Sequence, residues 1–334
     1  MSSTVAHDRE PARRSGKLTI IAAKLVVTAA CFWYLSRQID VSAVSSAARG
    51  LDLGWAALAA LLAVSQIPLV GLRWRAILDA LVAAERQMTA VSLIAITAIG
   101  LFFAQVLPSV AGEGIRAWLL VRRGGDWRHA LTSVAIDRGV GVGVAIALGF
   151  VILLLPFGLS ALGGYRDLVL TIFGMLLLGA TLVLLLLPRL IGLLDGIRYL
   201  RWVKALATDS RRVVLGRRSP AIFAIACLIH AFTIVIIWLL GRAQGLLLPI
   251  PDAAVLFMVM IGVAMVPISI NGWGLRELAV VALLGRHGVS PEQALVFSVC
   301  FGLVLAVASL PGALAWLLYS VAPTNAPSRA MNNA

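Results

Sequence analysis

Eight apolar runs, each about as long as a membrane-crossing helix, constrain this chain more than any other feature. A helix needs about 20 residues to cross the hydrocarbon core, with a range of about 17–25. Hydrophobic residues make up 61% of the 334 residues and charged residues only 13%. This composition is far from that of a typical soluble domain. The sequence therefore predicts an all-α polytopic membrane protein. The runs fall at about 18–36, 55–72, 90–107, 131–155, 168–187, 220–241, 253–270 and 295–318.

Two regions are predicted to be re-entrant helical hairpins, which leaves six simple spans. Residues 90–121 and 253–285 each contain a proline followed by two glycines, and such residues break a helix at membrane depth. The glycines are expected to precede the second arm of each hairpin, where they either permit a tight turn or open a helix N-terminus to an anion. The hairpin residues are Pro108, Gly112 and Gly114 in the first, and Pro267, Gly272 and Gly274 in the second.

The two hairpin tips resemble each other and predict an internal repeat. Four identical residues recur at a displacement of 160 positions: Ser109, Gly112, Gly114 and Arg116 match Ser269, Gly272, Gly274 and Arg276. We expect repeat 1 over 18–160 and an inverted repeat 2 over 161–322, with tails at 1–17 and 323–334. Inverted repeats with broken helices are typical of transporters, which bind their substrate near the bilayer midplane.

The distribution of basic residues predicts the orientation. The net charge is +13, and 19 of the 28 Lys and Arg residues fall in segments expected on the cytoplasmic side, as the positive-inside rule requires. We therefore expect the protein to lie in the inner cell membrane with both termini in the cytoplasm. We expect no nucleic-acid partner. The segment 189–219 holds eight of these bases. It is either a basic amphipathic helix on the inner leaflet or an ordinary positive-inside loop.

Six charged residues in or beside the membrane are the candidate site. A charge at the bilayer centre is costly and usually faces a partner or a cavity. Glu113 and Arg116 are three apart and can share one helix face. Arg276 and Glu277 are adjacent, so they are expected to point in different directions and to have partners elsewhere. The six either form internal ion pairs that fix the hairpins, or bind an anionic headgroup. They are Glu113, Arg116, Asp137, Arg138, Arg276 and Glu277.

Other polar and small residues favour structural roles. Gly139, Gly141 and Gly143 follow no strand, so a dinucleotide site is not expected, and the spacing of Gly139 and Gly143 predicts close helix packing. His230 lies within a span and is expected to be a packing residue rather than a proton relay. No disulfide framework, metal ligand set or cofactor is expected.

Three motifs together resemble a known family. They are Leu107-Pro108-Ser109-(x3)-Glu113-(x2)-Arg116, then Asp137-Arg138, and Pro267-x-Ser269-x2-Gly272-x-Gly274-x-Arg276-Glu277. The chain resembles, over about 18–320, the flippase-like membrane module of bacterial lysylphosphatidylglycerol synthases, a superfamily that also includes stand-alone proteins, some associated with hopanoid lipids. Glu113 stands where the family often has Asp, and Trp273 where a smaller residue is usual.

The resemblance implies a lipid flippase or transporter that binds an anionic or aminoacylated headgroup between the hairpins. Its partners would be membrane lipids: a phospholipid, a polyprenyl lipid or a hopanoid. The family's aminoacyl-transferase activity belongs to a soluble domain, which we do not expect here, and so we expect no enzyme activity. The alternatives are a membrane-embedded polyprenyl-phosphate or lipid-modifying transferase, and a scaffold for a lipid-modifying partner protein.

Overall fold

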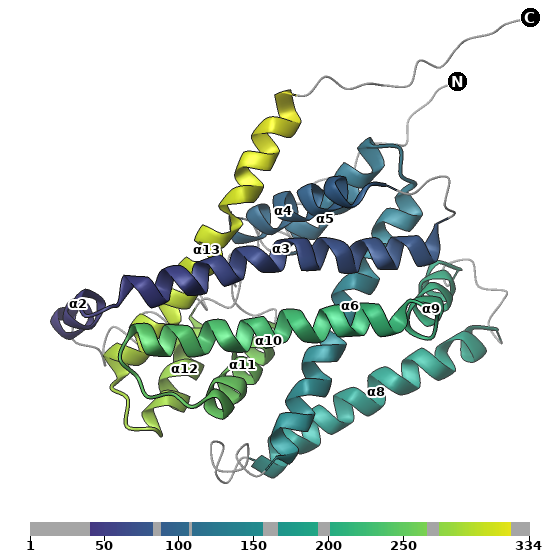
Figure 1. Ribbon diagram of the computed structural model, residues 1–334. Helices are drawn as coiled ribbons and strands as arrows, with labels where there is room; N and C mark the ends of the chain where they lie inside the picture. The colour runs from purple at the N-terminus through teal and green to yellow at the C-terminus, as the bar shows by residue number, and fades with distance from the viewer. Residues whose placement is uncertain are drawn as a thin grey trace, which may run out of the picture.

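The computed structural model describes residues 41–82, 88–106, 109–155, 166–192, 201–265 and 274–321, and every regular element within them is an α-helix (Figure 1). The predicted span 18–36 and both predicted tails lie outside these residues. The helices are α2 Val41–Arg49, α3 Leu53–Leu81, α4 Ala90–Val106, α5 Ser109–Arg122, α6 Trp127–Leu154, α8 Arg166–Gly192, α9 Arg201–Val214, α10 Ser219–Ala243, α11 Ile250–Met265, α12 Leu275–Gly285 and α13 Pro291–Val321.

Four of the described helices are long and apolar enough to cross a membrane: α3, α6, α10 and most of α13. Shorter apolar helices lie within α4, α8 and α11. Their large lipid-compatible side chains stay exposed, as on α8, where Met175 is 68% and Leu178 60% exposed. The predicted class, an all-α multi-pass membrane protein, is confirmed.

Helices α3 and α10 pack along each other in antiparallel directions (Figure 1). At one end, the Asp52 backbone N–H donates to the Ala243 carbonyl oxygen at 2.7 Å, which joins the start of α3 to the end of α10. At the other end, Arg218 forms an ion pair with Asp79, near the end of α3. Helices α6 and α13 also run in opposite directions in Figure 1. These directions are those that an inverted repeat requires.

The helices α4 and α5 form one hairpin, and α11 and α12 form the other. Each hairpin returns to its side of origin. Arg123 donates to Ser92 at 2.9 Å across the open end of the first hairpin, and His287 lies 3.8 Å from Asp252 across that of the second. The arms have 17, 14, 16 and 11 residues, fewer than the 20 or so that cross a bilayer. The first hairpin packs on α13 and the second on α6.

The prediction for the glycines is wrong in the first hairpin. Helix α5 already begins at Ser109, so Gly112 and Gly114 lie inside the helix rather than before it. In the second hairpin, Gly274 does precede α12, and its φ of 88° is a conformation that favours glycine. Pro108, Pro267 and Gly272 lie outside the described residues.

The basic segment 189–219 contains the amphipathic helix α9. Residues 193–200 of the segment lie outside the described part. Helix α9 packs against α8, α3 and α6. An ion pair of 3.7 Å joins Asp209 of α9 to Arg128 in the first turn of α6. Asp126 caps that same turn, and the hydrogen bond from the His129 backbone lowers the pKa of its carboxyl group. A location on the inner leaflet stays a prediction.

Candidate functional site

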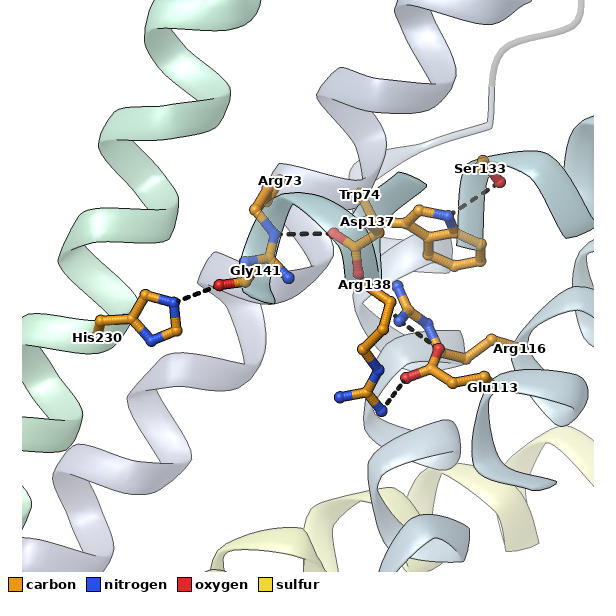
Figure 2. A network of polar contacts seen from close by, with 9 residues as sticks. All are labelled: Arg73, Trp74, Glu113, Arg116, Ser133, Asp137, Arg138, Gly141 and His230. Atoms are coloured by element: carbon orange, nitrogen blue, oxygen red, sulfur yellow. Dashed lines mark hydrogen bonds and ion pairs between the residues drawn. The ribbon is translucent and has the colours of Figure 1, made fainter. Parts of the chain in front are cut away.

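A buried ion-pair group joins α3, the first hairpin and α6 around Asp137. One carboxylate oxygen of Asp137 accepts from Arg73 Nε at 2.8 Å, and the other accepts from Arg116 Nη1 at 3.1 Å (Figure 2). All three residues are buried. Asp137 thus ties the second arm of the hairpin to two long helices. A carboxylate that binds two guanidinium groups offsets much of its own desolvation cost.

Glu113 extends the group from the protein interior to an exposed surface. Its carboxylate accepts from Arg116 Nη1 at 2.8 Å, as the three-residue spacing predicted, and forms a second ion pair with Arg138 of α6. The side chain of Arg116 is only 4% exposed, that of Glu113 18%, and that of Arg138 56%. Figure 2 shows Glu113 between the two arginines. The group therefore has a closed end at Arg73 and an open end at Arg138.

Arg116 has hydrogen-bonding capacity that the surrounding residues do not use. Its Nε and Nη2 atoms are buried and have no hydrogen-bond partner among the described residues. The guanidinium carbon lies 4.4 Å from the centroid of the Trp74 ring, and the Trp74 indole N–H donates to Ser133 at 3.2 Å. The group holds three guanidinium groups and two carboxylates, so its net charge is +1. A buried donor without an acceptor is costly, and an anion would satisfy it.

Two glycines and a histidine complete the surroundings. A side chain at Gly100 of α4 would overlap the aliphatic stem of Arg116, so glycine is needed for the arginine to lie against α4. At Gly141 of α6, a Cβ atom would lie 3.3 Å from the Arg73 guanidinium. His230 Nε2 is 2.9 Å from the Gly141 carbonyl oxygen, and this backbone contact fits the packing role predicted for His230.

The second hairpin carries its own buried group. Arg276 Nη2 lies 2.6 Å from Glu277 Oε1, and Ser298 of α13 donates to the same oxygen at 3.0 Å. Glu277 Oε2 accepts from the Gly274 backbone N–H at 2.6 Å, which fixes the start of α12. Arg276 and Glu277 therefore pair with each other, which the sequence did not predict, and each also contacts a partner elsewhere. Ser298 Oγ lies within hydrogen-bond distance of both side chains, 3.1 Å from Arg276 Nε and 3.0 Å from Glu277 Oε1.

The six predicted charges thus fall into two groups rather than into one described set of contacts. Glu113, Arg116, Asp137 and Arg138 belong to the group around Asp137, and Arg276 and Glu277 to the group around Ser298. Each group links the second arm of a hairpin to the helix that follows it. At the 160-residue displacement, Arg138 corresponds to Ser298. The two residues contact a glutamate of their own group, Arg138 through an ion pair and Ser298 through a hydrogen bond.

Sequence reasoning missed Arg73, which was counted among the cytoplasmic bases. The hydropathy run was ended at residue 72, because Arg73, Arg75 and Asp79 lower the average over the next turns. A usable signal was present, however. Apolar residues continue at helical spacing through Trp74, Ile77, Leu78 and Leu81, and this pattern predicts one continuous helix with a buried face. Ser298 carried no comparable signal.

The close helix packing predicted for Gly139 and Gly143 is not seen within the described residues and stays a prediction. Among the described residues, no atom outside their own helix lies within 4 Å of a Cβ atom built at either glycine. Both glycines instead line an apolar cavity of about 550 Å³ between α6, α8, α9 and α10.

Together, the apolar helices, the paired hairpins and the buried ion-pair groups define a multi-pass helical membrane protein with buried charged groups between its helices. The sequence profile of one family, described as the lysylphosphatidylglycerol synthase TM region, matches residues 21–312. The chain belongs to this family. The comparison with curated proteins gives no match, and the comparison with solved structures gives none either.

Proposed function

We propose that this protein is a flippase-like lipid transporter of the inner cell membrane, with both termini in the cytoplasm. It binds the anionic or aminoacylated headgroup of a membrane lipid between its two hairpins. Membership of the lysylphosphatidylglycerol synthase TM family supports a lipid-related role. The opposite directions of α3 and α10 support a repeat whose halves face opposite sides of the membrane.

The observation that carries the proposal is the unused hydrogen-bonding capacity of Arg116. Its Nε and Nη2 atoms are buried without a partner among the described residues, inside a group with a net charge of +1. Arginine binds phosphate through two parallel N–H donors. Arg138, at the open end of the group, gives a phosphate its first contact, and Arg116 gives it the inner one. In the second half, Arg276 stands at the position equivalent to Arg116 in the repeat, and on that ground we propose that it also contacts the lipid phosphate.

Transport by the purified protein in proteoliposomes tests the proposal. The substrate is fluorescent phosphatidylglycerol, and dithionite reports how much of it lies in the outer leaflet. The intact protein should move the lipid, and Arg116→Ala should slow it on the order of tenfold or more, because charge-assisted hydrogen bonds are worth about 1.5–3 kcal/mol. Arg276→Ala should act likewise.

Arg122→Ala is the matched control, because Arg122 lies on α5 with an exposed side chain that contacts Trp118. It should transport at the rate of the intact protein. If Arg116→Ala lowers protein stability, Arg138→Ala replaces it, since the half-exposed Arg138 can be removed without leaving a cavity. Unchanged transport in Arg116→Ala and Arg138→Ala would disprove the site, and no transport by the intact protein would disprove the function.

A further inference from the structure

We infer that the cavity between α6, α8, α9 and α10 binds one acyl chain of an anionic phospholipid, whose phosphate is held by basic residues of α9. None of the six candidate site residues lines this cavity. The inference therefore concerns a second lipid site, separate from the proposed transport site.

The cavity has the shape and chemistry of a hydrocarbon chain site. One face of α6 lines it from Ala135 to Val151, a helix length of about 24 Å. The facing residues come from α8, α9 and α10 and include Leu177, Leu206 and Phe223. Burial of each CH₂ group in such a site contributes about 0.8 kcal/mol.

Two glycines keep the cavity open. Gly139 and Gly143 lie one turn apart on the lining face of α6, and a Cβ atom at either position would meet no other residue of the described part within 4 Å. A larger residue would cost nothing in helix formation, because glycine is among the poorest helix formers. The space therefore depends on the absence of side chains at these positions and would be filled by leucine.

The charges at one end of the cavity select the headgroup. Ser210 of α9 lines the cavity, and Arg211 follows it, with a buried Nε that has no hydrogen-bond partner among the described residues. Arg212 beside it is exposed, and both lie in the last turn of α9. Arg128 of α6 is held near the same helix by Asp209. A phosphate at this end would meet complementary charge while its acyl chain enters the cavity.

Photo-cross-linking tests the inference in nanodiscs. The probe is phosphatidylglycerol with a diazirine on one acyl chain, and phosphatidylcholine with the same chain is the comparison. We expect labelled peptides from 135–151 of α6 and from 219–227 of α10, with stronger labelling by phosphatidylglycerol. Gly143→Leu should abolish this labelling, whereas Gly179→Leu, on α8 outside the lining, should not change it. Arg211→Gln with Arg212→Gln should weaken it about fivefold for each charge removed.

Three results would overturn the inference. One is labelling spread evenly over the exposed face of α8 and unaffected by Gly143→Leu, which would indicate ordinary surrounding lipid. Another is equal labelling by both lipids, which would remove the role of the α9 charges. The third comes from a separate experiment with paired cysteines: a disulfide between α6 and residues 18–36 would assign the cavity to the chain itself. Transport in proteoliposomes is scored separately, so either proposal can fail while the other stands.

Discussion

Asp137 accepts hydrogen bonds from two buried guanidinium groups, and we expect its charge to stabilise the group around Asp137. Its oxygens contact Arg73 on α3 and Arg116 on α5. Sequence reasoning identified Asp137 and Arg116 because a charge within an apolar run is conspicuous. It could not pair them, because a contact between residues 21 apart depends on how the hairpin packs against α6.

Removal of this charge should destabilise the protein. In Asp137→Asn, Arg73 and Arg116 lose their shared carboxylate, and removing one partner of a buried ion pair costs about 3–5 kcal/mol. We expect a clearly lower thermal-unfolding midpoint in detergent, measured by intrinsic tryptophan fluorescence. Arg217→Gln, at an exposed position between α9 and α10, is the control and should unfold at the original midpoint. Equal midpoints for both variants would show that the Asp137 contacts contribute little.

The first hairpin owes its compactness to glycines that lie inside helices rather than at its tip. A Cβ atom at Gly112 would lie 2.8 Å from the Ala104 Cβ atom, whereas one at Gly114 would meet no other residue of the described part within 4 Å. The Gly-x-Gly motif recurs after 160 residues and predicted two hairpins. It suggested the same role for Gly112 and Gly114, namely that both precede the second arm. Their helical phase separates them, since two residues apart on a helix means opposite faces.

The two glycines should therefore respond oppositely to the same substitution. Gly112→Ala should lower the unfolding midpoint, because overpacking costs about 1–3 kcal/mol. Gly114→Ala should be neutral or should raise the midpoint, since alanine in a helix is favoured over glycine by about 0.5–1 kcal/mol. The same thermal measurement compares them. Identical shifts in the two variants would contradict the tight contact between α4 and α5.

At the scale of the whole molecule, the sequence patterns predicted the class of protein and the order of its apolar helices. Hydropathy cannot show where a helix ends when charged residues lie on one face of it, and for this reason α3 was ended nine residues early, before Arg73. The contacts of α3 with α10 also have no local signal. They place Asp52 beside Ala243 and Asp79 beside Arg218. The loop before α3 and the loop after α10 therefore lie on one side of the membrane, and the loop after α3 and the loop before α10 lie on the other.

Cysteine labelling in whole cells tests this arrangement and its predicted orientation. In a chain whose native cysteines are replaced by alanine, Leu247→Cys and Ser46→Cys should react with a membrane-impermeant maleimide from outside, because both positions are exposed at the same end of the α3 and α10 pair. Arg217→Cys, exposed at the opposite end, should react only after lysis. Reaction of Arg217→Cys in intact cells would reverse the orientation, and reaction of Leu247→Cys and Ser46→Cys from opposite sides would contradict the fold.

Native mass spectrometry of the lipids retained by the purified protein tests most directly whether the group around Arg116 binds an anionic headgroup. Arg138→Ala opens that group without removing a buried side chain, and Arg122→Ala on α5 is the control. We predict that Arg138→Ala retains one anionic phospholipid fewer per protein than the intact protein and Arg122→Ala do. The same number of anionic lipids on all three proteins would contradict the account.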